Sequence, residues 1–335
     1  MKMLSYGEVN LRFTPPEYQL LEQTNQLTYQ ITGTGVNLLA NLKNFGLETT
    51  LLTTLPNNSI GKVARATLRK YGINDQFIRL NGNHMGSYFV EMGYGLRPTV
   101  VTYQNRLASA FCQANPASYP IEEAVATSDF VHICGISLLL TEQTRETALK
   151  IAATAKKYNK KLYFDFNYRP SLNTQHTKEF IKEQYEKILY SADTVFGGIR
   201  DLTELLDIKA PELASELEQL KAVTEIFKEE YHIDTFVGTM RSFEEGKHYL
   251  AGFMARGEFQ VSSRQSVAIL DRIGAGDAYA AGIIFGQTEN WGEEKTLEFA
   301  VHNAVLAHAI PGDVPHTTVS EVEALMSNKQ QSLIR

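Results

Sequence analysis

The residues best suited to chemistry lie in one short stretch, residues 271–286, which reads DRIGAGDAYAAGIIFG. Gly274, Ala275 and Gly276 precede an apolar run of mostly small residues that is typical of a buried helix. Backbone N–H groups at a helix N-terminus point to one spot, and with the helix dipole they bind anions. Because glycine has no side chain, a phosphate group can approach this backbone closely. The stretch therefore predicts a phosphate site.

Asp277 directly follows this turn. A carboxylate beside an anion site is electrostatically unfavourable, which indicates that it has a task of its own. We interpret Asp277 as a general base, which takes a proton from a substrate hydroxyl as that hydroxyl attacks a phosphorus atom held by the turn. The plainer alternative is a glycine turn capped by an aspartate, with no chemistry. The four residues GAGD alone leave both interpretations open.

Other common signatures are incomplete or absent from the sequence. Residues 33–38 read GTGVNL and begin like a dinucleotide fingerprint, but Leu38 stands where the third glycine is required. Pro56 occupies the first glycine position of a P-loop, and Val63 follows Lys62. HExxH, CxxC and GxSxG do not occur, and the 8 histidines are scattered. These patterns exclude the best-known nucleotide-loop, zinc and serine-hydrolase motifs.

Composition and charge narrow the class of protein. The 335 residues are 43% hydrophobic and 21% charged, with a net charge of −6 and no basic stripe. We therefore expect neither a nucleic-acid nor a membrane partner. Cys112 and Cys134 are isolated, which predicts two buried thiols, neither a disulfide nor a zinc site. Because the N-terminus lacks the apolar core of a signal peptide, a cytoplasmic location is expected.

The elements that must position these residues follow an α/β pattern. Short apolar runs predict buried strands, and stretches with apolar residues three and four apart predict helices between them. Such alternation indicates a parallel sheet with helices on both faces. The predicted strands are 3–7, 49–56, 130–135, 161–170, 194–198 and 235–239, and the predicted helices are 35–45, 62–72, 141–159, 177–193, 211–231 and 278–286.

Two segments, 8–32 and 84–110, break this alternation because they are strand-like and contain no convincing helix. We interpret them as a small β-sheet lid inserted in an α/β domain formed by residues 1–7, 33–83 and 111–335. Ligands bind at the carboxyl ends of parallel strands, where such a lid would exclude water. Edge strands of the lid invite pairing between subunits, which makes a homo-oligomer through the lid plausible.

DRIGAGDAYAAG resembles the C-terminal signature of the ribokinase-like (PfkB) family of carbohydrate kinases, and the resemblance covers nearly the whole chain. GTGVNLLANLKNFG matches the glycine-rich first signature, with Gly33, Gly35 and Asn37 in place. Five further segments are similar to the 2-keto-3-deoxygluconate kinases of that family: GEVNLRFTPP, HMGSYFVE, YQNRLASA, DFNYRP and AHAIPGDVPHTTVSEVEAL.

The resemblance implies a ribokinase-like three-layer α/β sandwich with a mostly parallel central sheet and a β-lid. It also implies phosphorylation of a sugar hydroxyl with ATP and Mg²⁺ as cofactors, and it makes a monovalent cation a further candidate. By position, Asp277 corresponds to the catalytic base, and Gly274, Ala275 and Gly276 to the anion hole. The implied substrate contacts are Gly33, Asn37, Tyr88, Tyr103, Arg106 and Arg169, and the implied nucleotide contacts are Asp271, Thr239, Arg241, Gly274 and Gly276.

An arginine cluster bears on the substrate. Arg97 and Arg106 lie on the predicted lid, and Arg169 ends a predicted strand. Arginine binds carboxylates through paired donors, which favours the C6 hydroxyl of 2-keto-3-deoxygluconate, a sugar acid, as the acceptor. Kinases for 5-keto-2-deoxygluconate, fructose, tagatose phosphate, ribose or a nucleoside are the alternatives.

The sequence departs from the family pattern at several positions. In FGGIRDLTELL, Gly198 replaces the asparagine of an Asn-x-x-Glu motif linked to Mg²⁺, and Asp201 replaces the glutamate. We expect Asp201, acting through water, or Glu204 to take over. This loss motivates a further alternative, a non-catalytic sugar-acid sensor.

Two departures lie close to the proposed contacts. Ile273 replaces a threonine before GAGD, and the added Arg272 could meet a phosphate or the substrate carboxylate. Tyr103 lies three residues before Arg106, where two is usual, and a shift of one residue along a strand would turn its side chain to the other face.

Overall fold

The computed structural model of the chain describes residues 1–170 and 175–327. Its centre is a ten-stranded sheet in the order β13-β12-β11-β10-β9-β8-β1-β4-β5, with β14 paired to β12. All pairs from β11 to β5 are parallel, whereas the β12 pairs are antiparallel. The strands are β1 (Lys2–Tyr6), β4 (Glu48–Leu55), β5 (Ile78–Leu80), β8 (Phe130–Cys134), β9 (Lys161–Asp165), β10 (Thr194–Phe196), β11 (Thr235–Glu244), β12 (Lys247–Ala255), β13 (Phe259–Val261) and β14 (Gln265–Val267).

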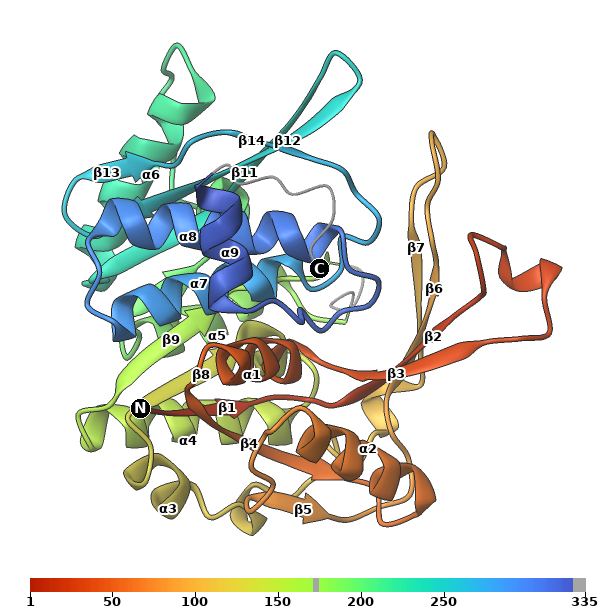
Figure 1. Cartoon of the computed structure of the whole chain (residues 1–335). Helices are drawn as coiled ribbons and strands as arrows, with labels where there is room; N and C mark the ends of the chain where they lie inside the picture. The colour runs from red at the N-terminus through yellow and green to blue at the C-terminus, as the bar shows by residue number, and fades with distance from the viewer. Residues whose placement is uncertain (171–174, 328–335) are drawn as a thin grey trace.

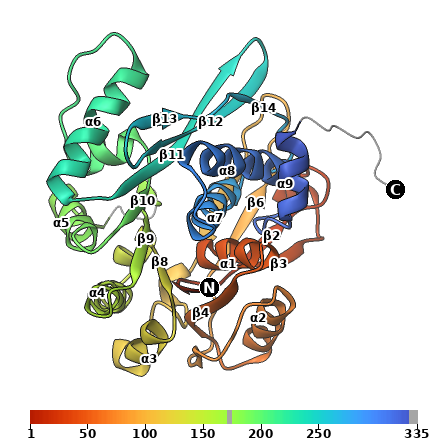
Figure 2. The same cartoon turned by 60° about the vertical axis from the view of Figure 1, so that its left-hand side comes forward.

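Helices cover both faces of this sheet, so the predicted three-layer α/β fold is confirmed (Figure 2). One face carries α3, α4, α5 and α6, and the other carries α1, α2, α7, α8 and α9. Their bounds are α1 (Thr34–Asn44), α2 (Ser59–Lys70), α3 (Ile121–Ala126), α4 (Glu142–Lys157), α5 (Lys178–Leu189), α6 (Glu216–Tyr231), α7 (Ala275–Thr288), α8 (Glu293–His308) and α9 (Val319–Met326).

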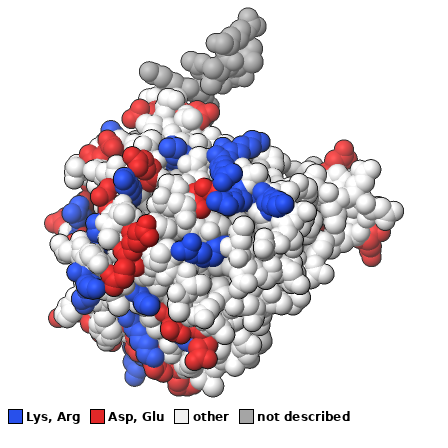
Figure 3. Space-filling view, turned by 90° about the horizontal axis from the view of Figure 1, so that it is seen from below, with Lys and Arg blue, Asp and Glu red and all other residues white. Residues whose placement is uncertain are grey.

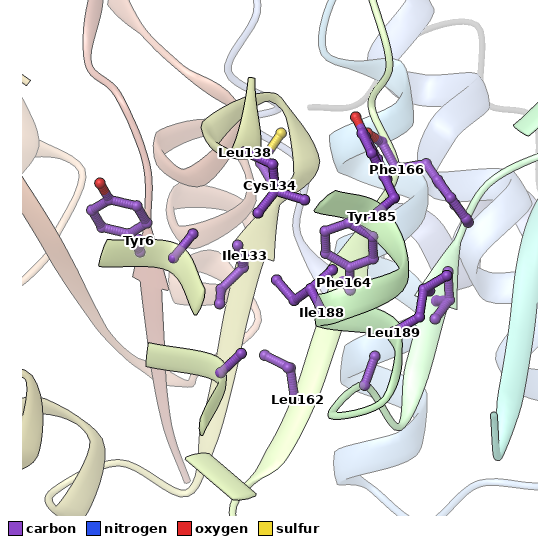
Figure 4. Packing of buried hydrophobic residues seen from close by; sticks show 14 of the residues in the cluster. Tyr6, Ile133, Cys134, Leu138, Leu162, Phe164, Phe166, Tyr185, Ile188 and Leu189 are labelled. Carbon is purple, nitrogen blue, oxygen red and sulfur yellow. The ribbon is translucent and has the colours of Figure 1, made fainter. Parts of the chain in front are cut away.

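The core between the sheet and α3–α6 is built from apolar and aromatic side chains (Figure 4). Phe166 stacks on Tyr185 of α5 with ring centroids 5.5 Å apart. Strands β8 and β9 are buried on both faces, which explains their nearly continuous apolar sequences. Cys112 and Cys134 are free and buried, as predicted, and burial raises the pKa of each thiol to about 12.

A separate four-stranded sheet projects from the side of the molecule (Figure 1). Its order is β3-β2-β6-β7, with β2 and β6 parallel and the outer pairs antiparallel. All four strands come from the two segments predicted to form a lid: β2 (Asn10–Thr14), β3 (Thr28–Thr32), β6 (Ser87–Glu91) and β7 (Val100–Gln104). We call this sheet the lid. Residues 171–174 and 328–335 of the expected α/β domain lie outside the described residues.

Several predicted elements have different bounds in the structure; the strand predicted at 161–170, for example, ends at Asp165, and the helix predicted at 177–193 ends at Leu189. The strand predicted at 235–239 continues to Glu244 and turns back into β12, because Glu245 and Gly246 adopt positive φ and form a tight turn. The helix predicted from residue 211 begins only at Glu216, because the side chain of Ser215 caps it by accepting from the N–H of Glu218.

The molecular surface in Figure 3 carries Lys and Arg side chains interspersed with Asp and Glu. Within residues 1–170 and 175–327, no helix is both long and apolar enough to cross a membrane.

Candidate active site

A cavity of about 1480 Å³ lies at the carboxyl ends of the parallel strands, between the lid and the start of α7. Asp165 at the end of β9 and Phe196 at the end of β10 form part of its wall. Sheets of this kind bind ligands at this edge. Most of the residues singled out in the sequence line it together: Gly33, Asn37, Tyr88, Tyr103, Arg106, Arg169, Gly198, Asp201, Glu204, Thr239, Arg241, Arg272, Gly274, Gly276 and Asp277.

The GAGD turn forms the first residues of α7. Gly274 has φ 85°, and a Cβ atom there would overlap the carbonyl oxygen of Asp313, so only glycine fits. At Gly276 a Cβ atom would meet no atom within 4 Å, which leaves its cavity side open. The N–H groups of a first helical turn have no partner within the helix. Gly274 and Gly276 therefore form an exposed donor surface that a phosphate can reach.

Ala275 differs from its neighbours in the turn. It is buried, it does not line the cavity, and its N–H points to the carbonyl oxygen of Arg272 at 3.5 Å. Of the three residues predicted to form the anion site, Gly274 and Gly276 line the cavity and Ala275 does not.

Asp277 is buried at the cavity wall, where Oδ2 accepts a hydrogen bond of 2.7 Å from Nδ2 of Asn37 in α1. The pKa of Asp277 is raised to about 8: burial is the largest cause, the hydrogen bond from Asn37 and the charge of Arg169 oppose the rise, and the nearby carboxylates of Asp165 and Asp313 add to it. A carboxyl group with such a pKa is a stronger base than a solvated one. Its position beside the open turn fits proton transfer at neutral pH.

Carboxylates also line the part of the cavity that follows β10 and borders β11, which we call the donor side because a phosphate donor would bind there. Asp201 accepts a hydrogen bond of 2.8 Å from the N–H of Gly198, and burial raises the pKa of Asp201 to about 6. Asp165 and Glu204 lie on the same wall. A Cβ atom on Gly198 would meet Asp201 no closer than 3.9 Å, so the place of the missing asparagine side chain is open.

No group of three or more His, Cys, Asp or Glu side chains within the described ranges could hold a metal by itself. Mg²⁺ is typically held by one or two carboxylates together with substrate phosphates. Asp201 and its neighbouring carboxylates fit that mode, with oxygen donors only, and they would hold the ion jointly with a bound nucleotide.

Arg241 and Arg272 carry the positive charge on the donor side. Burial and the charge of Arg272 lower the pKa of Arg241, which means that the two guanidinium groups repel each other. Arg264, also on this wall, is neutralised by Glu244 at 2.6 Å and lies over the Tyr249 ring. A polyanion such as a nucleoside triphosphate would relieve the repulsion between Arg241 and Arg272.

The lid side of the cavity carries polar groups suited to a sugar. Oδ1 of Asn10 and Oδ1 of Asn37 are both buried without a hydrogen-bond partner among the described residues. A buried acceptor without a partner is costly, so both atoms are prepared for ligand hydroxyl groups. Asn10 was not predicted as a site residue; its signal was its place in the opening segment GEVNLRF, where polar and apolar residues alternate.

Arg106 lies on this side, under the lid. Its Nε donates to Oε2 of buried Glu8 at 2.5 Å, and its guanidinium lies 5.3 Å from the centre of the Tyr103 ring. This contact through Nε leaves the two terminal nitrogens for a ligand. Tyr103 lines the cavity despite its unusual spacing, because it lies opposite Tyr88 in the β6–β7 pair. Glu8 is another functional candidate absent from the sequence-based set.

Two residues of the predicted site lie elsewhere. Asp271, predicted to contact the nucleotide, is buried outside the cavity and paired with Arg12, which fits a role in the framework of the turn. Arg97, predicted to join the carboxylate-binding cluster, donates instead to the carbonyl oxygens of Tyr18 and Met92 within the lid region. Of the three arginines predicted to bind the carboxylate, Arg106 and Arg169 line the cavity.

Comparison with known proteins adds independent evidence. The model of the pfkB family of carbohydrate kinases matches residues 1–314. A 2-dehydro-3-deoxygalactonokinase of Haloferax volcanii is 26% identical over 330 residues, which cover 97% of this chain and 96% of that one. A 5-dehydro-2-deoxygluconokinase of Clostridium tetani is 23% identical over 340 residues, which cover 99% of this chain and 94% of that one.

Solved structures give the same result. A protein from Enterococcus faecalis, described as a candidate 2-keto-3-deoxygluconate kinase, is 51% identical with a TM-score of 0.97, over 100% of this chain and 99% of that one. A 2-dehydro-3-deoxygluconokinase of Thermotoga maritima is 29% identical with a TM-score of 0.92, over 98% and 99%. A candidate ribokinase of E. coli, solved with ATP and Mg²⁺, shares the fold at 17% identity, with a TM-score of 0.76 and coverage of 98% and 99%.

Proposed function

The chain belongs to the pfkB family of carbohydrate kinases, which transfer phosphate to an alcohol group, and we propose that its acceptor is the C6 hydroxyl of 2-keto-3-deoxygluconate. The observation that carries the proposal is the position of Asp277: a buried carboxyl with a pKa raised to about 8, one residue after the open turn and inside the shared cavity.

Asp277 takes the proton of the C6 hydroxyl while the oxygen of that hydroxyl attacks the γ-phosphorus of ATP. The new O–P bond forms while the bond from the γ-phosphorus to the β-phosphate oxygen breaks, and ADP leaves. The amides around Gly274 and Gly276 hold the transferring phosphate, and Arg241 and Arg272 offset the charge of the triphosphate. Bound Mg²⁺, held at Asp201, would neutralise charge on the phosphate oxygens.

The side of the cavity under the lid supports a sugar acid as the acceptor substrate. Oδ1 of Asn10 and Oδ1 of Asn37 accept from sugar hydroxyl groups, which satisfies both atoms. The terminal nitrogens of Arg106, which have no hydrogen-bond partner within residues 1–170 and 175–327, form a two-pronged donor for the carboxylate, and Arg169 adds a second positive charge at the cavity wall. The names of the relatives from E. faecalis and T. maritima agree with this substrate class.

A second acceptor, 5-keto-2-deoxygluconate, is favoured by the C. tetani relative. It is also a keto-deoxy sugar acid, so the same arginines would bind it. The deciding contacts would be those that read the position of the keto group, for which Asn10 and Tyr103 are candidates.

The test mixes the purified protein and Mg-ATP with each compound of a panel of acceptors and measures the rate of ADP release. The panel contains 2-keto-3-deoxygluconate, 5-keto-2-deoxygluconate, gluconate, fructose, tagatose 6-phosphate, ribose and adenosine. We expect the highest kcat/KM with 2-keto-3-deoxygluconate. Preference for a neutral sugar would refute the carboxylate assignment, and sugar-acid binding without ADP release would favour the sensor. Replacing K⁺ by choline in the same assay tests the predicted monovalent cation.

The lid also supports the predicted homo-oligomer. Leu27 and Tyr29 near one edge of the lid and Val100 on the other are exposed apolar side chains, in a sheet that projects from the body (Figure 1). A second copy of the lid is the occupant that we propose for this surface. Sedimentation equilibrium should give a dimer or larger species, and Tyr29→Lys should shift it toward the monomer. A wild-type monomer at micromolar concentration would contradict the proposal.

A further inference from the structure

Arg12 of β2 is the largest fully buried side chain of the described structure, only 2% exposed, and it makes two ion pairs. One of its terminal nitrogens contacts Oδ2 of Asp271 at 2.6 Å, and the other contacts Oδ1 of Asp313. Both carboxylates are buried. We propose that Arg12 is a positioning residue, which holds the phosphate-binding turn in register with the acceptor-binding lid. This inference rests on the proposed function of the GAGD turn.

On one side, the chain of contacts runs through Asp271 to the turn. Oδ1 of Asp271 accepts from the N–H of Ile273 at 3.1 Å, and Oδ2 accepts from the N–H of Gly312 at 3.1 Å. Asp271 thus ties the residue directly before Gly274 to the segment that packs against Gly274 from the other side. Arg12 neutralises the carboxylate on which both hydrogen bonds depend.

On the other side, the contacts run through Asp313 to the lid. Oδ2 of Asp313 accepts from the hydroxyl of Tyr88 on β6, and that hydroxyl lies 2.8 Å from Oγ1 of Thr32 on β3. The carbonyl oxygen of Asp313 occupies the place that a side chain on residue 274 would need. Arg12, Thr32 and Tyr88 come from three strands of the lid, so most of the lid is joined to the turn.

The chemistry explains why this position needs arginine. Two carboxylates buried this deeply are strongly unfavourable without a cation, and Arg12 is their ion-pair partner within the described residues. The guanidinium fork reaches two carboxylates at once, whereas a lysine is a point charge. The charge balance is therefore complete only when β2 of the lid is seated against the loop that carries the turn. Phosphoryl transfer depends on such alignment between acceptor and donor.

The test compares Arg12→Met and Arg12→Lys with a matched control, Arg69→Gln, whose arginine pairs with Asp75 on the surface. We expect folded Arg12→Met protein to lose roughly 10²-fold in kcat, the usual cost of misalignment, while KM for ATP and for the acceptor changes little. Arg12→Lys should be intermediate, and Arg69→Gln should match the wild type. Guanidinium at low, non-denaturing concentration should restore part of kcat in Arg12→Ala.

An unchanged kcat in folded Arg12→Met, or a loss that appears only in KM, would overturn the proposal. If Arg12→Met does not fold, Asp313→Asn is the second variant: it keeps the Arg12–Asp271 pair and removes one charge, and we expect a smaller loss confined to kcat. No loss in kcat for Asp313→Asn would equally overturn it.

A readout without turnover separates this proposal from the proposed function. We expect ATP to slow hydrogen exchange in residues 271–277 of the wild type and to do so less in Arg12→Met. Equal protection in the two proteins would refute the role of Arg12 whatever the acceptor. Inactivity of the wild type toward the whole panel would refute only the proposed function.

Discussion

Nδ2 of Asn37 donates to Oδ2 of Asp277 across 2.7 Å, although the two residues are 240 positions apart in the chain. The bond joins the first turn of α1 to the first turn of α7. It orients the carboxyl group of Asp277, and it opposes the rise in pKa that burial causes. Two signatures at opposite ends of the sequence thus meet at the proposed catalytic base.

The first prediction concerns pH. Because burial raises the pKa of Asp277 to about 8 and a general base must be ionised, kcat/KM should rise about tenfold per pH unit below pH 8 and level off above it. Removing the Asn37 hydrogen bond in Asn37→Ala removes an effect that lowers this pKa, so the limb should move to higher pH. Initial rates between pH 5.5 and 9.5 measure both profiles; a rate that is already level at pH 5.5, as a carboxyl group with an ordinary pKa would give, would contradict the assignment.

The second prediction concerns Asp277→Asn. The variant should lose roughly 10²- to 10⁴-fold in kcat, the usual contribution of a positioned base, while its affinity for ATP is kept. Single-turnover kinetics and calorimetric titration with ATP measure the two quantities. Near-full activity would show that another group accepts the proton.

The same variant, Asp277→Asn, should lose activity but gain thermal stability. The folded pKa of Asp277 lies above its unfolded value of 3.8, so the neutral carboxyl stabilises the fold below about pH 4, and this contribution is lost as pH rises to about 8. Asparagine does not titrate. The Tm of Asp277→Asn should therefore exceed that of the wild type by a margin that grows between pH 4 and pH 8 and then stays constant. A margin independent of pH would argue against a raised pKa.

The third prediction uses the two glycines of the turn. Gly276→Ala adds a methyl group where no atom lies within 4 Å, so the protein should fold normally, and the methyl group should obstruct the phosphate and raise KM for ATP. Gly274→Ala places a Cβ against the Asp313 carbonyl at φ 85° and should lower Tm. Thermal denaturation and ATP titration distinguish the variants. Unchanged ATP affinity in Gly276→Ala would remove this turn from the phosphate site.

The fourth prediction separates the arginines. Arg106→Gln removes the two-pronged donor and should lower kcat/KM for 2-keto-3-deoxygluconate by roughly 10- to 100-fold, with KM for ATP unchanged. Arg97→Gln is the matched control, because the Arg97 side chain donates to the carbonyl oxygens of Tyr18 and Met92 and lies outside the cavity lining. Equal losses in the two variants would point to a general disturbance of the lid, against a carboxylate contact at Arg106.

Local pattern in the sequence was enough to predict the layers of this fold, and it predicts a phosphate site at the turn. Alternating apolar and amphipathic runs follow from the periods of strands and helices. GAGD before a small-residue helix indicates a phosphate site because the backbone N–H groups at such a helix N-terminus bind anions. The role of Asp277 stayed open from GAGD alone, because an aspartate that only caps the turn fits the same four residues; the resemblance of the wider sequence to the kinase family favours the general base.

Side-chain partners between distant segments were decided only in the tertiary structure. Arg12 and Asp271 are 259 positions apart, and no local pattern shows that they form a buried pair. The family signature implied a nucleotide contact for Asp271, which instead lies outside the cavity lining. Arg97 and Arg106 both place a positive charge in the lid sequence, yet the first donates to backbone carbonyl oxygens and the second lines the cavity beside Glu8. Local periodicity determines which residues share a face; the contacts between faces, and with them burial, charge pairing and the pKa of Asp277, arise only when the whole chain is packed.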